Sequence, residues 1–372
     1  MTPIPHYRTD GSAQAPVLVL GPSLGTSLAV WDAQVPALAR RHQVLRWDLP
    51  GHGRSPASLV TEGATVADLA ALVLALADHL GVERFAYAGI SLGGAVGLHL
   101  AVHHPDRVTS LAVVCSSARF GDPAGWQERA ALVRGKGTQA VAEATAGRWF
   151  TPAFAAHQAA VTMIADLRAA DPAGYSACCD ALAAYDLRGE LTAITAPTLV
   201  LAGRQDPATP PAHSRQLADG IAESTLLELP GAAHLAPVEQ PDAVLTALQG
   251  HFTPTAAAGT AVRRAVLGDA HVDRSVERTT AFTADFQDFI TRYAWGEIWT
   301  RPGLDRRTRS CITLTALVAH GHQTELALHI EAALRNGLTP DEIKEVLLQS
   351  AVYCGVPAAN SAFATAQRVL AG

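Results

Sequence analysis

The sequence predicts an α/β domain with a mostly parallel sheet, followed by an all-helical domain. In the first two thirds of the 372 residues, short aliphatic runs alternate with helical patterns, as in a parallel sheet with helices on both faces. After residue 253 only helical patterns are present. The segment at the boundary, residues 253–260, consists mostly of small residues and is rich in alanine. We therefore expect a first domain at 1–253, a linker at 254–261 and a helical domain at 262–372.

Composition and charge exclude several classes of protein. Apolar residues make up 49% of the chain and charged residues 17%, below the usual level of about 25% charged, which indicates compact cores rather than disorder. The net charge is −6 and no long basic run is present, so nucleic acid is not an expected partner. The five cysteines show no C-x-x-C or zinc spacing, which indicates structural thiols. We expect a cytoplasmic protein without a membrane span.

The strands of the first domain are expected where aliphatic runs are short and bounded by turn residues. These runs are 17–20, 44–47, 85–88, 108–114, 198–202 and 225–229. A crossover helix is expected from the capping residue Thr65 to Leu80, with Gly81 as its stop. Residues from about 119 to 190 contain helical patterns but no strand pattern. We interpret them as a helical cap inserted into the sheet domain.

The second domain is expected to contain helices at 279–294, 306–319, 323–335, 341–353 and 358–370. Thr339, Pro340 and Glu342 provide a capping hydroxyl, a proline in the first turn and a carboxylate at the third helical position, which together indicate a helix start.

A candidate nucleophile lies in the first domain. Gly89-Ile90-Ser91-Leu92-Gly93 follows an expected strand and precedes a helical pattern, the context in which G-x-S-x-G forms a nucleophile elbow. The alternative is a glycine-rich turn with an ordinary serine. Asp206 and His234 follow later in the chain, each after an expected strand. The order Ser, Asp, His predicts a triad in which His234 takes the proton of Ser91 and Asp206 orients the imidazole.

The backbone N–H groups of Leu24 and Leu92 are the expected oxyanion hole. Leu92 follows the nucleophile, and Leu24 lies in the turn after the first expected strand, where a nucleophile-elbow architecture supplies its second donor. His52 is a competing histidine, but it precedes the serine. We interpret its loop as structural.

These features resemble those of α/β-hydrolases and, more narrowly, of 3-oxoadipate enol-lactonases. The narrower resemblance rests on Ser23-Leu24-Gly25-Thr26, Trp31-Asp32, the run 48–55 and Arg148-Trp149-Phe150-Thr151. It implies hydrolysis of a small enol-lactone that carries a carboxylate, and therefore a cationic contact from the cap. Arg134 and Arg148 are the candidates, although a solvated role is open for both.

The helical domain has a second candidate site. Glu325 and His329 are four residues apart, and His322 lies one turn earlier, so the three share a helix face. With His320 they could hold a metal, or they could form a solvent-side pair; we expect no metal. The arginines before them either are solvated or hold a carboxylate in a forked pair; they are Arg301, Arg306, Arg307 and Arg309.

This half resembles the carboxymuconolactone decarboxylase family. The matching segments are 271–275, 295–304, 305–310, 325–329 and 353–357. Related alkylhydroperoxidase D-like proteins carry a C-x-x-C pair where this chain has His322 and Glu325. The missing dithiol favours decarboxylation over peroxidase chemistry.

The resemblance implies a butenolide substrate with two carboxylates. Such a substrate delocalises the electrons left by CO2 into its own lactone carbonyl, so no cofactor is expected. His329 or Glu325 is the candidate proton donor, and Arg301 or Arg309 the candidate for binding charge. Glu297 and His322 are further candidates for substrate binding.

The combined interpretation is a fused bifunctional enzyme of protocatechuate catabolism that acts on small-molecule lactone carboxylates and forms a homo-oligomer through its helical domain. Two alternatives stay open at this point. One is a single serine hydrolase with a non-catalytic helical assembly domain, and the other is a cofactor-free haloperoxidase-like hydrolase.

Overall fold

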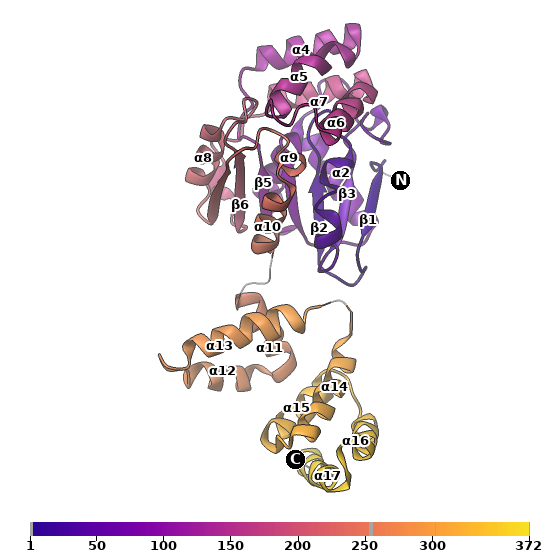
Figure 1. Cartoon of the computed structure of the whole chain (residues 1–372), viewed down its shortest axis with the longest axis vertical. Coiled ribbons are helices and arrows are strands. Elements are labelled where there is room, and N and C mark those ends of the chain that lie inside the picture. Colours follow the sequence, from indigo (N-terminus) through magenta and orange to yellow (C-terminus); the bar gives the residue numbers. More distant parts are fainter. Residues whose placement is uncertain (1–2, 253–255, 302, 372) are drawn as a thin grey trace. The chain divides into compact units, whose positions relative to one another are not determined.

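The computed structural model describes residues 3–252, 256–301 and 303–371. The chain forms two compact units, Met1–Phe252 and Thr253–Gly372 (Figure 1). Part of the expected linker is wrong, because residues 256–261 are the start of helix α11 (Ala256–Leu267). This segment is rich in alanine, the strongest helix former. The remainder of that linker, 254–255, lies outside the described residues.

A seven-stranded sheet forms the centre of the first unit, in the order β1-β3-β2-β4-β5-β6-β7. Every neighbouring pair is parallel except β1 and β3, which confirms the expected mostly parallel sheet. The strands are β1 (Tyr7–Asp10), β2 (Val17–Gly21), β3 (Gln43–Trp47), β4 (Phe85–Ile90), β5 (Val108–Val114), β6 (Thr198–Gly203) and β7 (Ser224–Leu229). The sequence did not indicate β1, because this edge strand is short and largely polar.

Helices pack on the sheet and form the cap. The first unit contains η1 (Leu28–Trp31), α1 (Val35–Leu38), η2 (Ala57–Leu59), α2 (Val66–His79), α3 (Leu92–His103), α4 (Pro123–Lys136), α5 (Gln139–Trp149), α6 (Gln158–Ala169), α7 (Pro172–Ala184), η3 (Leu191–Ala193), α8 (Pro211–Gly220), α9 (Ala236–Glu239) and α10 (Pro241–Phe252). Helices α4 to α7 follow β5 without an intervening strand and gather at one end of this unit (Figure 1). They are the cap that the sequence predicted.

The second unit is helical throughout its described residues. It contains α11, α12 (Asp269–Glu277), α13 (Ala284–Ile290), the π-helix η4 (Thr291–Ile298), α14 (Arg306–His320), α15 (Gln323–Arg335), α16 (Pro340–Cys354) and α17 (Val356–Leu370). None of the helices in the described part of the chain has the length and apolar character needed to cross a bilayer.

The expected single helix at 279–294 is wrong in two respects. Thr280 and Thr283 form a hydrogen-bonded turn, in which the Thr280 amide donates to Thr283 Oγ1 at 2.9 Å, and α13 begins only after it. The helix then passes into the π-helix at Thr291. Here α11 approaches very closely, since a Cβ on Gly259 would lie 2.2 Å from the Thr291 carbonyl oxygen. Helical periodicity in the sequence does not reveal such a contact.

Candidate active site

Ser91 occupies a strained turn between β4 and α3. Its φ of 55° is positive, a conformation that costs energy for a residue with a side chain. The turn is also crowded, because a Cβ on Gly89 would lie 2.2 Å from the Gly93 carbonyl oxygen. The Ser91 amide donates to the Val114 carbonyl at 2.9 Å, and α3 begins at the next residue. The hydroxyl is therefore fixed at a helix N-terminus.

Asp206 and His234 form a buried pair. Asp206 follows β6, and its Oδ2 lies 2.8 Å from Nδ1 of His234. Thr209 donates from its hydroxyl to Oδ2 at 2.7 Å and from its amide to Oδ1 at 3.0 Å. Burial opposes ionisation of Asp206, but the facing His234 and the Thr209 hydrogen bonds outweigh burial and keep its pKa below the ordinary value. The carboxylate stays charged and holds the proton of His234 on Nδ1.

His234 and Ser91 line the same pocket, which also contains Leu24. With Nδ1 directed to Asp206, the other imidazole nitrogen is the one available as a base. Leu92 is the first residue of α3, so its amide has no partner within the helix. This combination of serine, histidine, aspartate and amide donors is suited to acyl transfer from an ester or lactone to water.

His52 supports the turn that carries Leu24. The amide of Gly25 donates to His52 Nε2 at 3.0 Å, and Nδ1 lies 2.9 Å from the Pro50 carbonyl oxygen. A carbonyl only accepts, so the proton is on Nδ1 and Nε2 is the acceptor. Burial lowers the pKa of His52, which favours this neutral form. Its hydrogen bonds are thus with backbone groups of Gly25 and Pro50, and its ring stacks on Tyr175 of the cap.

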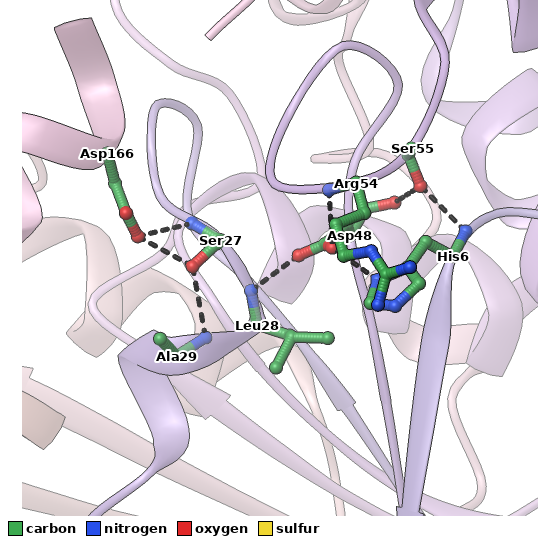
Figure 2. Close-up of polar contacts among 8 residues, drawn as sticks. All are labelled: His6, Ser27, Leu28, Ala29, Asp48, Arg54, Ser55 and Asp166. Atoms are coloured by element: carbon green, nitrogen blue, oxygen red, sulfur yellow. Dashed lines mark hydrogen bonds and ion pairs between the residues drawn. The ribbon is translucent and has the colours of Figure 1, made fainter. Parts of the chain in front are cut away.

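Asp48 anchors the end of the same turn, as Figure 2 shows. Its side chain is 1% exposed, and Oδ1 accepts from the Leu28 amide at 2.7 Å. Oδ2 accepts from the Arg54 amide at 3.0 Å and lies 2.7 Å from His6 Nδ1. One carboxylate therefore fastens three separate segments of the chain.

The cap contacts this turn through Asp166 on α6. Its Oδ2 accepts from the Ser27 hydroxyl at 2.6 Å and from the Ser27 amide at 3.2 Å (Figure 2). The Ser27 hydroxyl in turn accepts from the Ala29 amide at 3.3 Å. The position of the turn that bears Leu24 therefore depends on the cap as well as on the sheet.

Arg134 and Arg148, the two cap arginines predicted to bind substrate, lie in different places. Arg148 lines the pocket. Arg134 does not line it, because its guanidinium is engaged by the Asp180 carboxylate and lies 3.4 Å from Glu62. Its role in substrate binding stays a prediction that this pairing does not support.

Arg129 is a pocket residue that the sequence reasoning missed. Its Nε donates to the Tyr175 hydroxyl and its Nη2 to Thr145 Oγ1, both at 2.8 Å. Trp126, three residues earlier on α4, lines the same pocket. Residues three apart on a helix share a face. The spacing of Trp126 and Arg129 was therefore the feature of the sequence that could have indicated a pocket-lining arginine.

The candidate residues of the helical unit are less closely grouped than the triad residues of the first unit. His329 is partly buried, whereas Glu325 and His322 are exposed. Burial and the nearby His271 lower the pKa of His329, and Glu325 opposes them. Glu297 is partly buried. In the described part of the chain, no group of three or more His, Cys, Asp and Glu side chains is arranged to hold a metal ion.

The two arginines expected to bind charge do not join this cluster. Arg309 donates to the carbonyl oxygens of Arg301 and Leu304, at 2.8 and 3.2 Å. Arg301 is exposed. Among the described residues, neither arginine is hydrogen-bonded to, or paired with, His329 or Glu325. Arg309 instead fastens the loop before α14.

Comparison with known families agrees with both units. Residues 16–241 match the alpha/beta hydrolase fold family, and residues 284–368 match the carboxymuconolactone decarboxylase family. The 4-carboxymuconolactone decarboxylase of Acinetobacter baylyi is 50% identical over 111 residues, 30% of this chain and 83% of that protein. The chain belongs to both families.

Relatives of the first unit include a 3-oxoadipate enol-lactonase of Acinetobacter baylyi, 39% identical over 240 residues, which are 64% of this chain and 89% of that protein. The crystal structure of the enol-lactonase from Burkholderia xenovorans LB400 superposes with a TM-score of 0.65 at 38% identity, covering 67% of this chain and 96% of the other. We refer to the two parts below as the hydrolase unit and the helical unit.

Replacing Asp206 by Asn is expected to lower kcat for ester or lactone hydrolysis by about 10³- to 10⁴-fold. The amide group of Asn donates to Nδ1 of His234 and so places the proton on the nitrogen that must accept it from Ser91. Steady-state kinetics of the purified variant measure the loss. Arg204→Gln, an exposed change in the same loop, is the matched control. Activity of Asp206→Asn equal to that of the control would remove Asp206 from the triad.

Replacing Asp166 by Ala is expected to lower kcat of the same reaction by about tenfold, with a smaller change in KM, because the turn that carries one oxyanion donor loses its anchor in the cap. Arg168→Ala, an exposed change on the same helix, should leave the rate unchanged. A loss confined to KM would place Asp166 in substrate binding instead.

Proposed function

We propose that this chain is a bifunctional enzyme of the β-ketoadipate pathway. The helical unit decarboxylates 4-carboxymuconolactone to 3-oxoadipate enol-lactone, and the hydrolase unit hydrolyses that product to 3-oxoadipate. The observation that carries the proposal is that each unit matches a separate enzyme over most of that enzyme's length, 89% for the lactonase and 83% for the decarboxylase.

In the hydrolase unit, Ser91 Oγ attacks the lactone carbonyl while His234 accepts the serine proton. In this proposal the amides of Leu24 and Leu92 stabilise the oxyanion that forms. When the ring C–O bond breaks, the enol oxygen takes the proton back from His234. Water then hydrolyses the acyl-serine by the same base, and the enol tautomerises to the ketone.

In the helical unit, the bond between the ring carbon and one carboxylate breaks and CO2 leaves. The electron pair moves through the ring double bond to the lactone carbonyl oxygen, and a proton is then returned to carbon. His329 has a lowered pKa in the unliganded chain. A bound dianion would favour the imidazolium and raise that pKa, so substrate binding itself would prepare His329 as the donor.

The order of the two steps follows from their chemistry, because decarboxylation produces the enol-lactone that the hydrolase unit consumes. A cytoplasmic location is part of the proposal. It is supported by the free thiols of all five cysteines, which are typical of a reducing compartment.

Self-association through the helical unit is also proposed. Most of the large apolar side chains that are exposed among the described residues belong to this unit, although it is the shorter one. Phe282 is 95% exposed, and Val352, Tyr353 and Val356 are 76%, 78% and 64% exposed where α16 ends and α17 begins. A patch of this kind on a soluble unit marks an interaction surface.

Two variants of the full chain should separate the reactions. Given 4-carboxymuconolactone, Ser91→Ala should release CO2 and accumulate the enol-lactone, because only the nucleophile of the second step is missing. His329→Gln should leave the first substrate largely unconsumed yet hydrolyse added enol-lactone. Ultraviolet absorbance and product chromatography follow both intermediates, and His320→Gln, at an exposed helix end, is the control.

Release of CO2 by His329→Gln at the wild-type rate would remove that residue from the mechanism. If the wild-type chain released none, the proposal would give way to a serine hydrolase with a non-catalytic helical unit. Halogenation that depends on a peracid would instead identify a haloperoxidase-like hydrolase.

Replacing Tyr353 by Glu is expected to reduce the molar mass measured by light scattering toward that of a monomer, because a charge at the centre of an apolar interface is costly to bury. Val161→Glu places the same charge on an exposed position of the hydrolase unit and should leave the mass unchanged. A monomeric wild-type chain would refute the proposed assembly.

A further inference from the structure

Arg263 on α11 is a buried cation without a carboxylate partner among the described residues. It is 7% exposed. Burial lowers the pKa of Arg263. The ordinary pKa of an arginine side chain is so far above neutral that the guanidinium still stays charged. A buried charge that lacks a counter-charge is destabilising unless something else compensates it.

The groups that surround the guanidinium are all neutral. Nη1 donates to Gln287 Oε1 at 3.1 Å and to Thr291 Oγ1 at 3.4 Å, and Nη2 donates to Ser275 Oγ at 2.9 Å. Nε has no hydrogen-bond partner among the described residues. Three helical segments, α12, α13 and the π-helix, thus orient the guanidinium but leave its charge and one donor unsatisfied.

Two acidic side chains on the same helices are paired with other arginines. Asp273 of α12 accepts from Arg264 at 2.6 Å, and Asp288 of α13 accepts from Arg292 at 2.7 Å. These pairs are on the surface, whereas Arg263 is inside. These two carboxylates are therefore engaged elsewhere and are not partners of Arg263.

His271 connects this position with the candidate proton donor. After burial, the charge of Arg263 is the largest cause that lowers the pKa of His271. For His329, burial is the largest cause of its lowered pKa and the nearby His271 is the second. Helices α11 and α15 also pack together, since Val266, Leu267 and Ala332 share one apolar cluster. Arg263 therefore lies on a helix that packs against the one that carries His329.

We propose that Arg263, oriented by Ser275, Gln287 and Thr291, binds a carboxylate of the substrate of the helical unit. This inference rests on the proposed decarboxylation. It assigns the carboxylate that the product retains, since a guanidinium bound to the departing carboxylate would stabilise the ground state more than the transition state, which loses that charge. The neutral surroundings are suited to this role, because no resident carboxylate competes with the ligand.

The first test uses the full chain with Arg263→Gln. KM for decarboxylation of 4-carboxymuconolactone should rise about 10- to 100-fold, the usual effect of losing a charge-assisted fork, with a smaller change in kcat. Titration calorimetry with succinate, a non-reacting dicarboxylate, should show binding to the wild type and none to this variant. Arg264→Gln, at the neighbouring half-buried arginine that is paired with Asp269 and Asp273, should match the wild type in both measurements.

Gln287→Glu is a second test. It keeps Arg263 in place, so it does not require that the chain folds without this arginine. The new carboxylate would lie at the guanidinium, so the unfolding temperature should rise while succinate affinity falls and KM rises at least tenfold. A purely structural Arg263 predicts the rise in unfolding temperature alone. Unchanged KM and succinate affinity in folded Gln287→Glu, or in folded Arg263→Gln, would overturn the proposal.

The two readouts also separate this inference from the proposed function. If the wild-type chain released no CO2 but bound succinate in a manner that required Arg263, the decarboxylation would be refuted while an anion site at Arg263 would stand. If CO2 release were normal in Arg263→Gln, the function would stand and the assignment of Arg263 would be refuted.

Discussion

The strained turn at Ser91 is the constraint on which the rest of the hydrolase unit depends. A residue with a side chain keeps a positive φ only where its surroundings fix it. Here the Ser91 amide is bound to Val114 on the next strand, and the Tyr87 hydroxyl donates to the Gly93 carbonyl at 3.0 Å. Tyr87 itself is fully buried in β4, at the centre of the sheet. The packing of the sheet therefore fixes the position of both the nucleophile and the amide that follows it.

Buried carboxylates extend this rigidity to the two loops that complete the site. Asp48 anchors the turn that bears Leu24. Glu239 has the same function for the loop of His234, since it accepts from the Ala233 amide at 2.8 Å and from the Thr151 amide of the cap at 3.0 Å. Hydrogen bonds from backbone amides to a charged acceptor are stronger than neutral ones. Each loop is thus fastened by a group that itself takes no part in the chemistry.

The sequence predicted what is encoded locally and missed what depends on contacts between distant segments. Six of the seven strands and the serine turn follow from short patterns, so they were found, whereas the short polar edge strand β1 was not. Arg129 and Arg134 lie five residues apart on one helix, and the choice between them depends on Tyr175 and Asp180 of another helix. Arg263 was missed for the same reason, because its neutral partners come from separate helices and form no motif.

Arg129 of the hydrolase unit and Arg263 of the helical unit are held in a similar way, although the folds of the two units are unrelated. Arg129 is held by a phenol and a threonine hydroxyl, and Arg263 is held by an amide and two hydroxyls. In each case the orienting groups are neutral, whereas buried Arg46 and half-buried Arg264 are paired with carboxylates. Neutral hydrogen-bond acceptors fix the orientation of a guanidinium without neutralising its charge. Such an arrangement is suited to a site that binds a carboxylate-bearing substrate, because the bound anion supplies the counter-charge that the neutral groups do not.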